Sequence, residues 1–155
     1  MEPIVFCLHF RGQASRGADK RNLFRITASA PSCNFATELS DDGVSGKVSV
    51  LPGDMAFSES ELELTGSDSF SGHSSLAFGD GPHAIELKAA ASGHFESTSG
   101  SGKPGETITG AITWHVAGGE GQFTGAKGFV TSVLTLREDG EFSEYQTGMI
   151  FAQTQ

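Results

Sequence analysis

Apolar and polar side chains alternate along most of this 155-residue chain, and no window of helical length carries a 3.6-residue apolar stripe. The clearest case is the segment 107–116. There Ile112 and Trp114 share one face of an extended chain, and His115 lies on the other. A period of two is typical of strands that are buried on one side only. We therefore expect an all-β protein.

Asp-Gly pairs separate strand-like runs at Asp42-Gly43, Asp80-Gly81 and Asp139-Gly140. Because Asp-Gly suits the positive φ angles of a type I′ turn, each pair predicts a hairpin. The predicted hairpins span 33–50, 72–91 and 129–151, and further strands are expected at 4–11, 23–29, 58–65 and 107–116. About nine or ten strands at this spacing are typical of a barrel or a sandwich. We expect a single antiparallel up-and-down barrel over residues 1–155, because closure removes the sheet edges.

Two segments lack clear alternation and are predicted to be irregular. The segment 12–21 places Arg16, Lys20 and Arg21 among small polar residues. It is interpreted as a solvated loop or as a flap that brings cations to a site. The segment 92–105 is rich in Gly and Ser and is interpreted as a flexible linker, either without function or acting as a lid over a barrel mouth.

Composition excludes several partners. Acidic residues number 19 against 10 Lys plus Arg, a formal charge of -9 that repels a phosphate backbone, so no nucleic-acid partner is expected. No apolar run approaches the ~20 residues of a membrane span. Residues 1–10 lack the basic segment and cleavage site of a signal peptide, and the two cysteines have no C-x-x-C spacing. A cytoplasmic protein without a disulfide is expected.

Familiar nucleotide, hydrolase and metal motifs do not fit the sequence. Pro104 follows Gly102-Lys103 where a phosphate-binding loop needs Ser or Thr. Thr124 stands in place of the third glycine of a dinucleotide fingerprint. There is no G-x-S-x-G elbow, and the five histidines lack metal-ligand spacing. Neither a cofactor nor a metal is expected.

One segment reads GGEGQFTGAKG from Gly118 to Gly128. Gly118 and Gly119 are expected to let the chain leave the preceding strand at angles that a side chain forbids. Phe123 can then plug one end of a barrel, while Ala126 and Gly128 are small enough for the backbone to re-enter the sheet beside its neighbour. We predict that the main role of this segment is to build the fold rather than to contact a ligand.

The pattern G-G-x-G-x-F-x-G-A-x-G, with ITWHV (112–116) before it and YQTGMI (145–150) after it, resembles the allene oxide cyclase and dirigent superfamily of β-barrels. The resemblance covers residues 107–151. It implies an eight-stranded antiparallel barrel with an apolar cavity, often assembled as a dimer or trimer, that acts without a cofactor on hydrophobic, reactive small molecules. Allene oxide cyclases carry a catalytic carboxylate on the first barrel strand, whereas the segment 4–11 contains no acid. Their substrate and reaction are therefore not carried over.

Polar groups on strands carry the chemistry of such a barrel, because an apolar lumen shifts pKa values and strengthens each hydrogen bond. The candidate catalytic residues are His9, Arg25, His115 and Tyr145. The candidate ligand-binding residues are Cys7, Arg11, Phe35, Glu86, Trp114 and Phe123. The orientation of the first strand stays open: either its apolar face fills the lumen, or His9 and Arg11 point inward.

Each catalytic candidate has a chemical and a plainer interpretation. His9 and His115 suit general acid–base work near neutral pH. Arg25 suits a carboxylate or enolate oxygen, and Tyr145 suits a carbonyl. All four residue types are also common as surface, ion-paired or rim side chains. Two functions fit the sequence: a cofactor-free isomerase or cyclase acting on a hydrophobic small molecule in the cavity, or a non-catalytic barrel that carries or sequesters such a ligand.

Overall fold

The computed structural model describes residues 2–99 and 106–152. Within these residues nine strands form a single antiparallel sheet. The strands are β1 (Pro3–Arg16), β2 (Leu23–Ser40), β3 (Gly43–Leu64), β4 (Ser69–Phe78), β5 (Ala84–Ala89), β6 (Gly93–Ser99), β7 (Glu106–Glu120), β8 (Lys127–Arg137) and β9 (Glu141–Phe151). A short 3-10 turn, η1 (Gly121–Phe123), links β7 to β8. No helix in the described part of the chain has the length and apolar character that a bilayer crossing requires.

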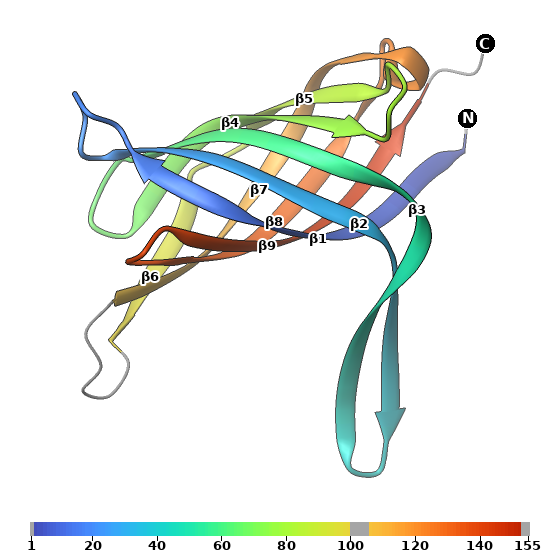
Figure 1. Cartoon of the computed structure of the whole chain (residues 1–155), viewed down its shortest axis with the longest axis horizontal. Coiled ribbons are helices and arrows are strands. Elements are labelled where there is room, and N and C mark those ends of the chain that lie inside the picture. The colour runs from blue at the N-terminus through green and yellow to red at the C-terminus, as the bar shows by residue number, and fades with distance from the viewer. Residues whose placement is uncertain (1, 100–105, 153–155) are drawn as a thin grey trace.

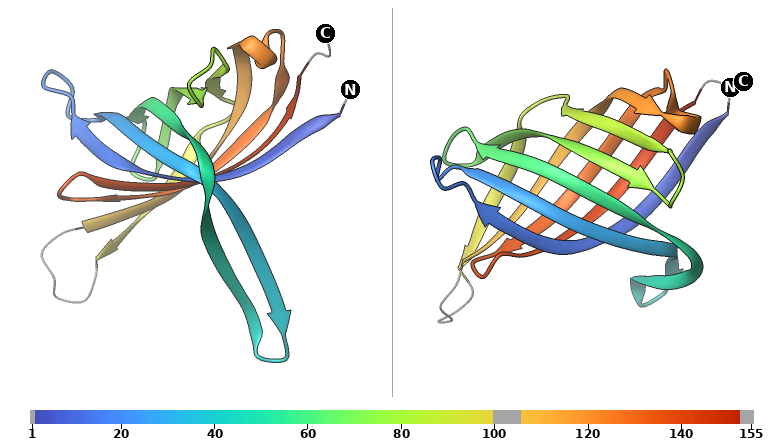
Figure 2. Two further views of the ribbon diagram at one scale, coloured as in Figure 1. Left: turned by 45° about the vertical axis from the view of Figure 1, so that its right-hand side comes forward. Right: turned by 45° about the horizontal axis from the view of Figure 1, so that its top comes forward.

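The sheet closes on itself into a barrel, as Figures 1 and 2 show. Its strands follow the order β3-β2-β1-β9-β8-β7-β5-β4, and the pairing of β3 with β4 completes the ring. β6 shares one position of the ring with β5, because both strands pair with β4 and β7. The predicted antiparallel barrel is confirmed.

The three hairpins predicted at the Asp-Gly pairs are present as β2–β3, β4–β5 and β8–β9. Their turns are not of type I′, because that type needs positive φ at both central residues, and among the described residues only glycines have positive φ. At the β8–β9 turn, Gly140 has a φ of 91° and its N–H donates to the Arg137 carbonyl oxygen. The Asp139 carboxylate accepts from the Glu141 N–H at 2.9 Å.

Both segments predicted to be irregular are partly strands. β1 continues to Arg16 and pairs with β2 along its last six residues, so the loop between them spans only 17–22. β6 lies within the segment 92–105 and pairs with β7. Pairing with a neighbouring strand overrides the weak strand preference of Gly and Ser here. Residues 100–105, which belong to the predicted linker or lid, lie outside the described residues.

Alternate residues of each strand point into the lumen. On β8, Val130 and Leu134 are buried, while Phe129 and Val133 are exposed on the outer face. The large apolar side chains that are almost fully buried include Trp114, Phe10, Ile26, Leu76, Ile85, Leu87 and Ile150. The middle of the lumen is therefore packed with side chains.

The glycine-rich segment 118–128 closes one end of this lumen, as predicted. Phe123 is 4% exposed, and its ring centroid lies 5.2 Å from that of Phe78. Gly121 and Gly125 adopt φ angles of 63° and 70°, so the left-handed conformations fall after the expected Gly118 and Gly119. We call Gly121–Phe123, with the buried Phe123 ring, the plug.

β2 and β3 extend beyond the barrel as a two-stranded arm, residues 34–51, which projects away from the ring in Figures 1 and 2. The pairing of β2 with β1 ends at Ser29. Pro31 follows and has no N–H to continue that ladder, and the β2–β3 register shifts between Pro31 and Cys33. The chain leaves the barrel at this point because the ladder cannot continue.

Candidate functional site

The structure determines which face of β1 points inward. Phe10 is fully buried and Leu8 packs on the same side, against the core. Cys7, His9 and Arg11 alternate with these residues and lie on the outer face. The interpretation with His9 and Arg11 in the lumen is wrong. The apolar face fills the lumen because its burial removes more apolar surface from water and leaves the charged group solvated.

Three further candidates also point outward, and they lie on different strands. Arg25 on β2 is exposed, with its Nε 3.3 Å from a carboxylate oxygen of Glu61. Glu86 on β5 accepts a hydrogen bond from the Ser75 hydroxyl at 2.6 Å. His115 on β7 is exposed. The barrel does not bring these three side chains together.

His9, Arg11 and Tyr145 are brought together in an outer pocket of about 310 Å³ on β1, β8 and β9. The His9 ring stacks on the Tyr145 ring with centroids 4.1 Å apart, and its Nε2 lies 2.8 Å from the Ser143 Oγ. Burial, and then the positive charge of Arg11, lower the pKa of His9, so its imidazole is neutral at pH 7. Polar and charged side chains dominate this pocket, and it suits a hydrophobic ligand poorly.

The remaining candidate ligand-binding residues lie in three different parts of the structure. Phe35 lies on the arm, edge-on to Tyr145, with ring centroids 6.0 Å apart. Phe123 forms the plug. Trp114 points into the lumen, where its Nε1 donates to the Ser132 Oγ at 2.8 Å. Of the residues selected from the sequence, Trp114 and Phe123 are those buried inside the barrel.

A buried polar cluster around Trp114 was not predicted. Glu144 and Gln146 of β9 and Ser132 of β8 are each at most 3% exposed. Glu144 Oε1 and both amide atoms of Gln146 have no hydrogen-bond partner among the described residues. Each such atom costs free energy, so stability alone does not explain the cluster.

Burial raises the pKa of Glu144, and the neighbouring Ser132 and Gln146 side chains offset part of that rise. The Gln146 amide is near enough to influence the carboxyl, yet its own atoms lack hydrogen-bond geometry to any partner. The Glu144 carboxyl therefore stays protonated further up the pH scale than an exposed glutamate does. A neutral acid of this kind can donate a proton to a ligand oxygen.

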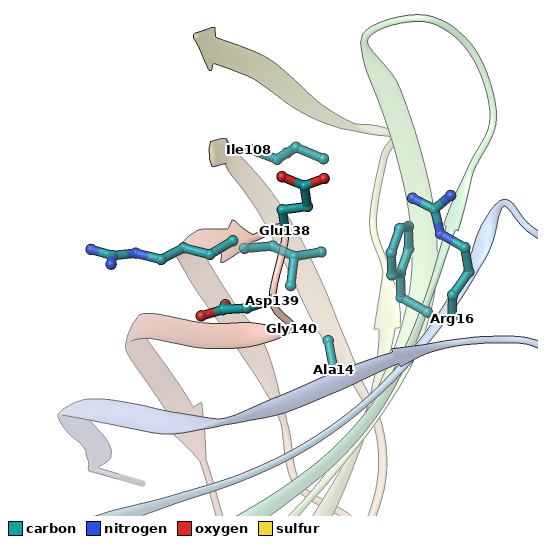
Figure 3. A pocket seen from close by; sticks show the side chains of 9 residues that line it. Ala14, Arg16, Ile108, Glu138, Asp139 and Gly140 are labelled. Atoms are coloured by element: carbon teal, nitrogen blue, oxygen red, sulfur yellow. The ribbon is translucent and has the colours of Figure 1, made fainter. Parts of the chain in front are cut away.

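Among the described residues, a pocket remains at the end of the barrel opposite the plug. A mouth pocket of about 600 Å³ lies there, close to where β7 begins and β8 ends (Figure 3). Its apolar wall is formed by Ala14, Phe24, Ile108 and Leu136. Its rim is charged, and Figure 3 shows Arg16 and Glu138 on facing sides. Such a pocket suits a ligand with an apolar body and a polar end.

Glu144 lies one layer beneath this mouth pocket. Leu136 lines the pocket, and Leu134, two residues deeper on β8, pairs with Glu144. Two residues of a strand span about 7 Å. Along β9, Phe142 lies between the pocket and Glu144 and is the cross-strand partner of Leu136.

The amino-acid composition of β9 gives no indication of the buried cluster. Its outward face carries Tyr145, Met149 and Phe151 and looks more apolar than the inward face with Glu144 and Gln146. The register of the β8–β9 hairpin was the signal that could have indicated that Glu144 points inward. The turn at Asp139-Gly140 aligns the apolar run of β8 with the inward carboxyl of β9.

Comparison with known proteins adds no relative: no family model, curated protein or solved structure matches this chain. The resemblance to allene oxide cyclases and dirigent proteins therefore stays a prediction. Within residues 2–99 and 106–152, no three His, Cys, Asp or Glu side chains gather in a way that would hold a metal ion.

Proposed function

We propose that this protein is a cofactor-free isomerase or cyclase that acts on a hydrophobic small molecule bound at the barrel mouth. The observation that carries the proposal is Glu144, a buried acid with a raised pKa and an unpaired oxygen, one layer beneath a pocket that has an apolar wall and a charged rim. Burying a carboxyl without a charged partner costs stability. A catalytic role gives a reason for that cost, since a carrier needs no acid.

The chemistry is a proton transfer that begins and ends at Glu144. For an unsaturated ketone, the neutral acid donates its proton to the carbonyl oxygen, and the carboxylate takes a proton from the carbon beside the carbonyl. The enol that forms returns the hydroxyl proton and accepts one at a different carbon, so the double bond shifts. The product has the formula of the substrate and Glu144 is restored. No electron acceptor or group donor is needed.

The apolar wall supplies the second part of catalysis, because it holds the substrate near a reactive conformer and excludes water. Phe142 lies between the pocket and the acid. Substrate therefore reaches Glu144 by displacing the Phe142 ring. The Trp114 indole, bonded to Ser132, holds that hydroxyl beside the carboxyl.

The second candidate function is a non-catalytic barrel that carries or sequesters a hydrophobic ligand. One observation favours it: the four candidate catalytic residues, His9, Arg25, His115 and Tyr145, all lie on the outer face of the barrel. In this case Glu144 is a polar anchor for the ligand. The mouth pocket is needed for both functions.

Turnover and binding by matched variants separate the two functions. A panel of small β,γ-unsaturated ketones is followed by the absorbance of the conjugated product, while the single tryptophan, Trp114, reports binding by its fluorescence. Glu144→Gln should bind the ketones like the wild type and lose at least about 100-fold in rate. Ala14→Phe should lose both, because its ring fills the mouth pocket. Ser15→Phe, on the outer face of β1, is the control.

Two outcomes would overturn the proposed enzyme activity. Binding without turnover by the wild type would favour the carrier, and so would equal turnover by the wild type and Glu144→Gln. Loss of binding in Ser15→Phe together with Ala14→Phe would place the ligand outside the mouth pocket.

A cytoplasmic location belongs to the same proposal. Cys7 and Cys33 are both free thiols, the state that a reducing compartment maintains. Burial raises the pKa of Cys33, which keeps its sulfur protonated, and that thiol donates to the Cys7 carbonyl oxygen. The chain's formal charge of -9 argues against a nucleic-acid partner.

A further inference from the structure

The arm, residues 34–51, has one apolar and one polar face. The apolar face carries the cross-strand pairs Phe35–Val48, Thr37–Gly46 and, at its tip, Leu39–Val44, and the pair Cys33–Val50 lies on the same face where the arm begins. The polar face carries Asn34–Ser49, Ala36–Lys47 and Glu38–Ser45. Leu39 and Val44 are 79% and 71% exposed. The arm thus presents to water an uncharged strip that is apolar except at the pair Thr37–Gly46.

The arm lacks support from its own barrel over most of its length. β2 pairs with β1 only as far as Ser29, and β3 pairs with β4 only from Ala56 onward. The described residues beyond these points form a ribbon of two strands. A two-stranded ribbon is at best marginally stable in water, and an apolar strip on it adds to the cost. Another protein surface packed over the strip would remove both problems.

The outer face of β1, β9 and β8 carries a second apolar surface, the wall patch. Its exposed members are neighbours across the strands: Val5 is paired with Met149, Met149 with Phe129, and Tyr145 with Val133. The outward residues between them, Cys7, Thr131 and Thr147, are uncharged. An uncharged patch of this extent is unexpected on a chain with a net charge of -9.

The two apolar surfaces meet where the arm leaves the barrel. Phe35 at the base of the arm packs edge-on against Tyr145 at the border of the wall patch. Strip and patch therefore form one bent apolar surface with a corner between them. A second copy related by a two-fold axis has the same corner. The arm of the second copy can therefore lie on the wall patch of the first, while the arm of the first lies on the wall patch of the second.

We propose that the protein forms a two-fold dimer in which the arm of each copy lies across the wall patch of the other. The strip and the wall patch lie on the same chain, and this favours a second copy as the occupant, because in a two-fold dimer each copy covers the patch of the other with its own strip. The absence of charge from both surfaces also favours it, since two acidic chains then meet without opposing carboxylates.

Matched charge substitutions on the two faces of the arm test the dimer. Val44→Asp and Ser45→Asp add the same charge at adjacent, exposed positions, and only Val44 lies on the apolar face. Sedimentation equilibrium of the full-length chain should show a wild-type dimer. Val44→Asp should raise its Kd at least about tenfold, and Ser45→Asp should leave it unchanged. Val5→Asp tests the wall patch and should weaken the dimer as Val44→Asp does.

Hydrogen exchange of the wild type gives a test without substitutions. Amides of the arm should be protected at a concentration where the dimer forms and should exchange faster on dilution, while those of the barrel stay protected at both concentrations. A wild-type chain that stays monomeric up to about millimolar concentration would overturn the proposal. A dimer that Val44→Asp leaves intact, a trimer, or arm protection that appears only on adding lipid vesicles would do the same.

Discussion

Glu144 combines two properties that rarely occur together at one residue: complete burial and a polar oxygen without a partner. Its carboxyl lies among Ser132, Gln146 and apolar side chains, and none of the described positive charges is among the causes that shift its pKa. The folded protein therefore favours the neutral acid. This preference links the chemistry proposed for the lumen to a measurable effect on stability.

Replacing Glu144 by Gln should change how stability depends on pH. An unfolded glutamate ionises with an ordinary pKa of about 4.5, whereas burial raises the pKa of Glu144 in the folded state. The unfolded wild type thus binds fewer protons than the folded one between these two values, and wild-type stability falls as pH rises through that window. The loss amounts to about 1.4 kcal/mol for each pH unit between them. Glu144→Gln lacks this loss.

Urea unfolding at a series of pH values from about 4 to 8 checks this prediction. The difference in unfolding free energy should move in favour of Glu144→Gln as pH increases. Glu141→Gln, at an exposed position on the same strand, should follow the wild type. Parallel curves for the wild type and Glu144→Gln would mean that the buried carboxyl titrates like an exposed one.

Individual site residues were harder to predict from the sequence than the strands that carry them. A histidine on an apolar strand looks like a catalytic base, yet His9 lies outside because the opposite face of β1 holds Phe10 and Leu8. Glu144 looks like a surface residue between Ser143 and Tyr145, yet the register of β9 turns it inward. Which face of a strand is inside depends on neighbours that one strand's sequence does not contain.

Among the elements, the plug makes a contribution to stability that truncation of one side chain can test. Phe123 is 4% exposed and packs on Phe78. Phe123→Ala should lower the free energy of unfolding by about 3–5 kcal/mol, because it removes apolar contacts and leaves a cavity at the closed end. Phe57→Ala, at a position 49% exposed on β3, should cost under about 1 kcal/mol. Denaturant unfolding of both variants measures the difference, and equal losses would contradict a buried plug.

Turn chemistry explains which elements were predictable. Each Asp-Gly pair marked a hairpin correctly, because a turn is set by residues next to one another in sequence. The turn type was wrong, since the glycines alone adopt positive φ in the described residues. The hairpin 33–50 was predicted, but its projection beyond the barrel as the arm was not. β6 was not predicted, because it is held by pairing with β7 and its Gly- and Ser-rich sequence does not indicate a partner.

For the whole molecule, alternation and hairpin spacing were sufficient to predict a closed antiparallel barrel. They did not predict how much of the lumen is open. Side chains such as Trp114 and Phe10 pack its middle, and the mouth pocket lies at one end. That distribution depends on the sizes of side chains from opposite strands, which meet only after the sheet has closed.

Carbon-13 NMR titration of the glutamate carboxyls tests most directly whether the buried acid serves a ligand at the mouth. The Glu144 signal is assigned by its absence from Glu144→Gln. It should titrate above the range of the other glutamates, and its midpoint should move when a β,γ-unsaturated ketone binds and quenches Trp114. An ordinary midpoint, or a raised one that bound ligand leaves unmoved, would contradict the proposed function.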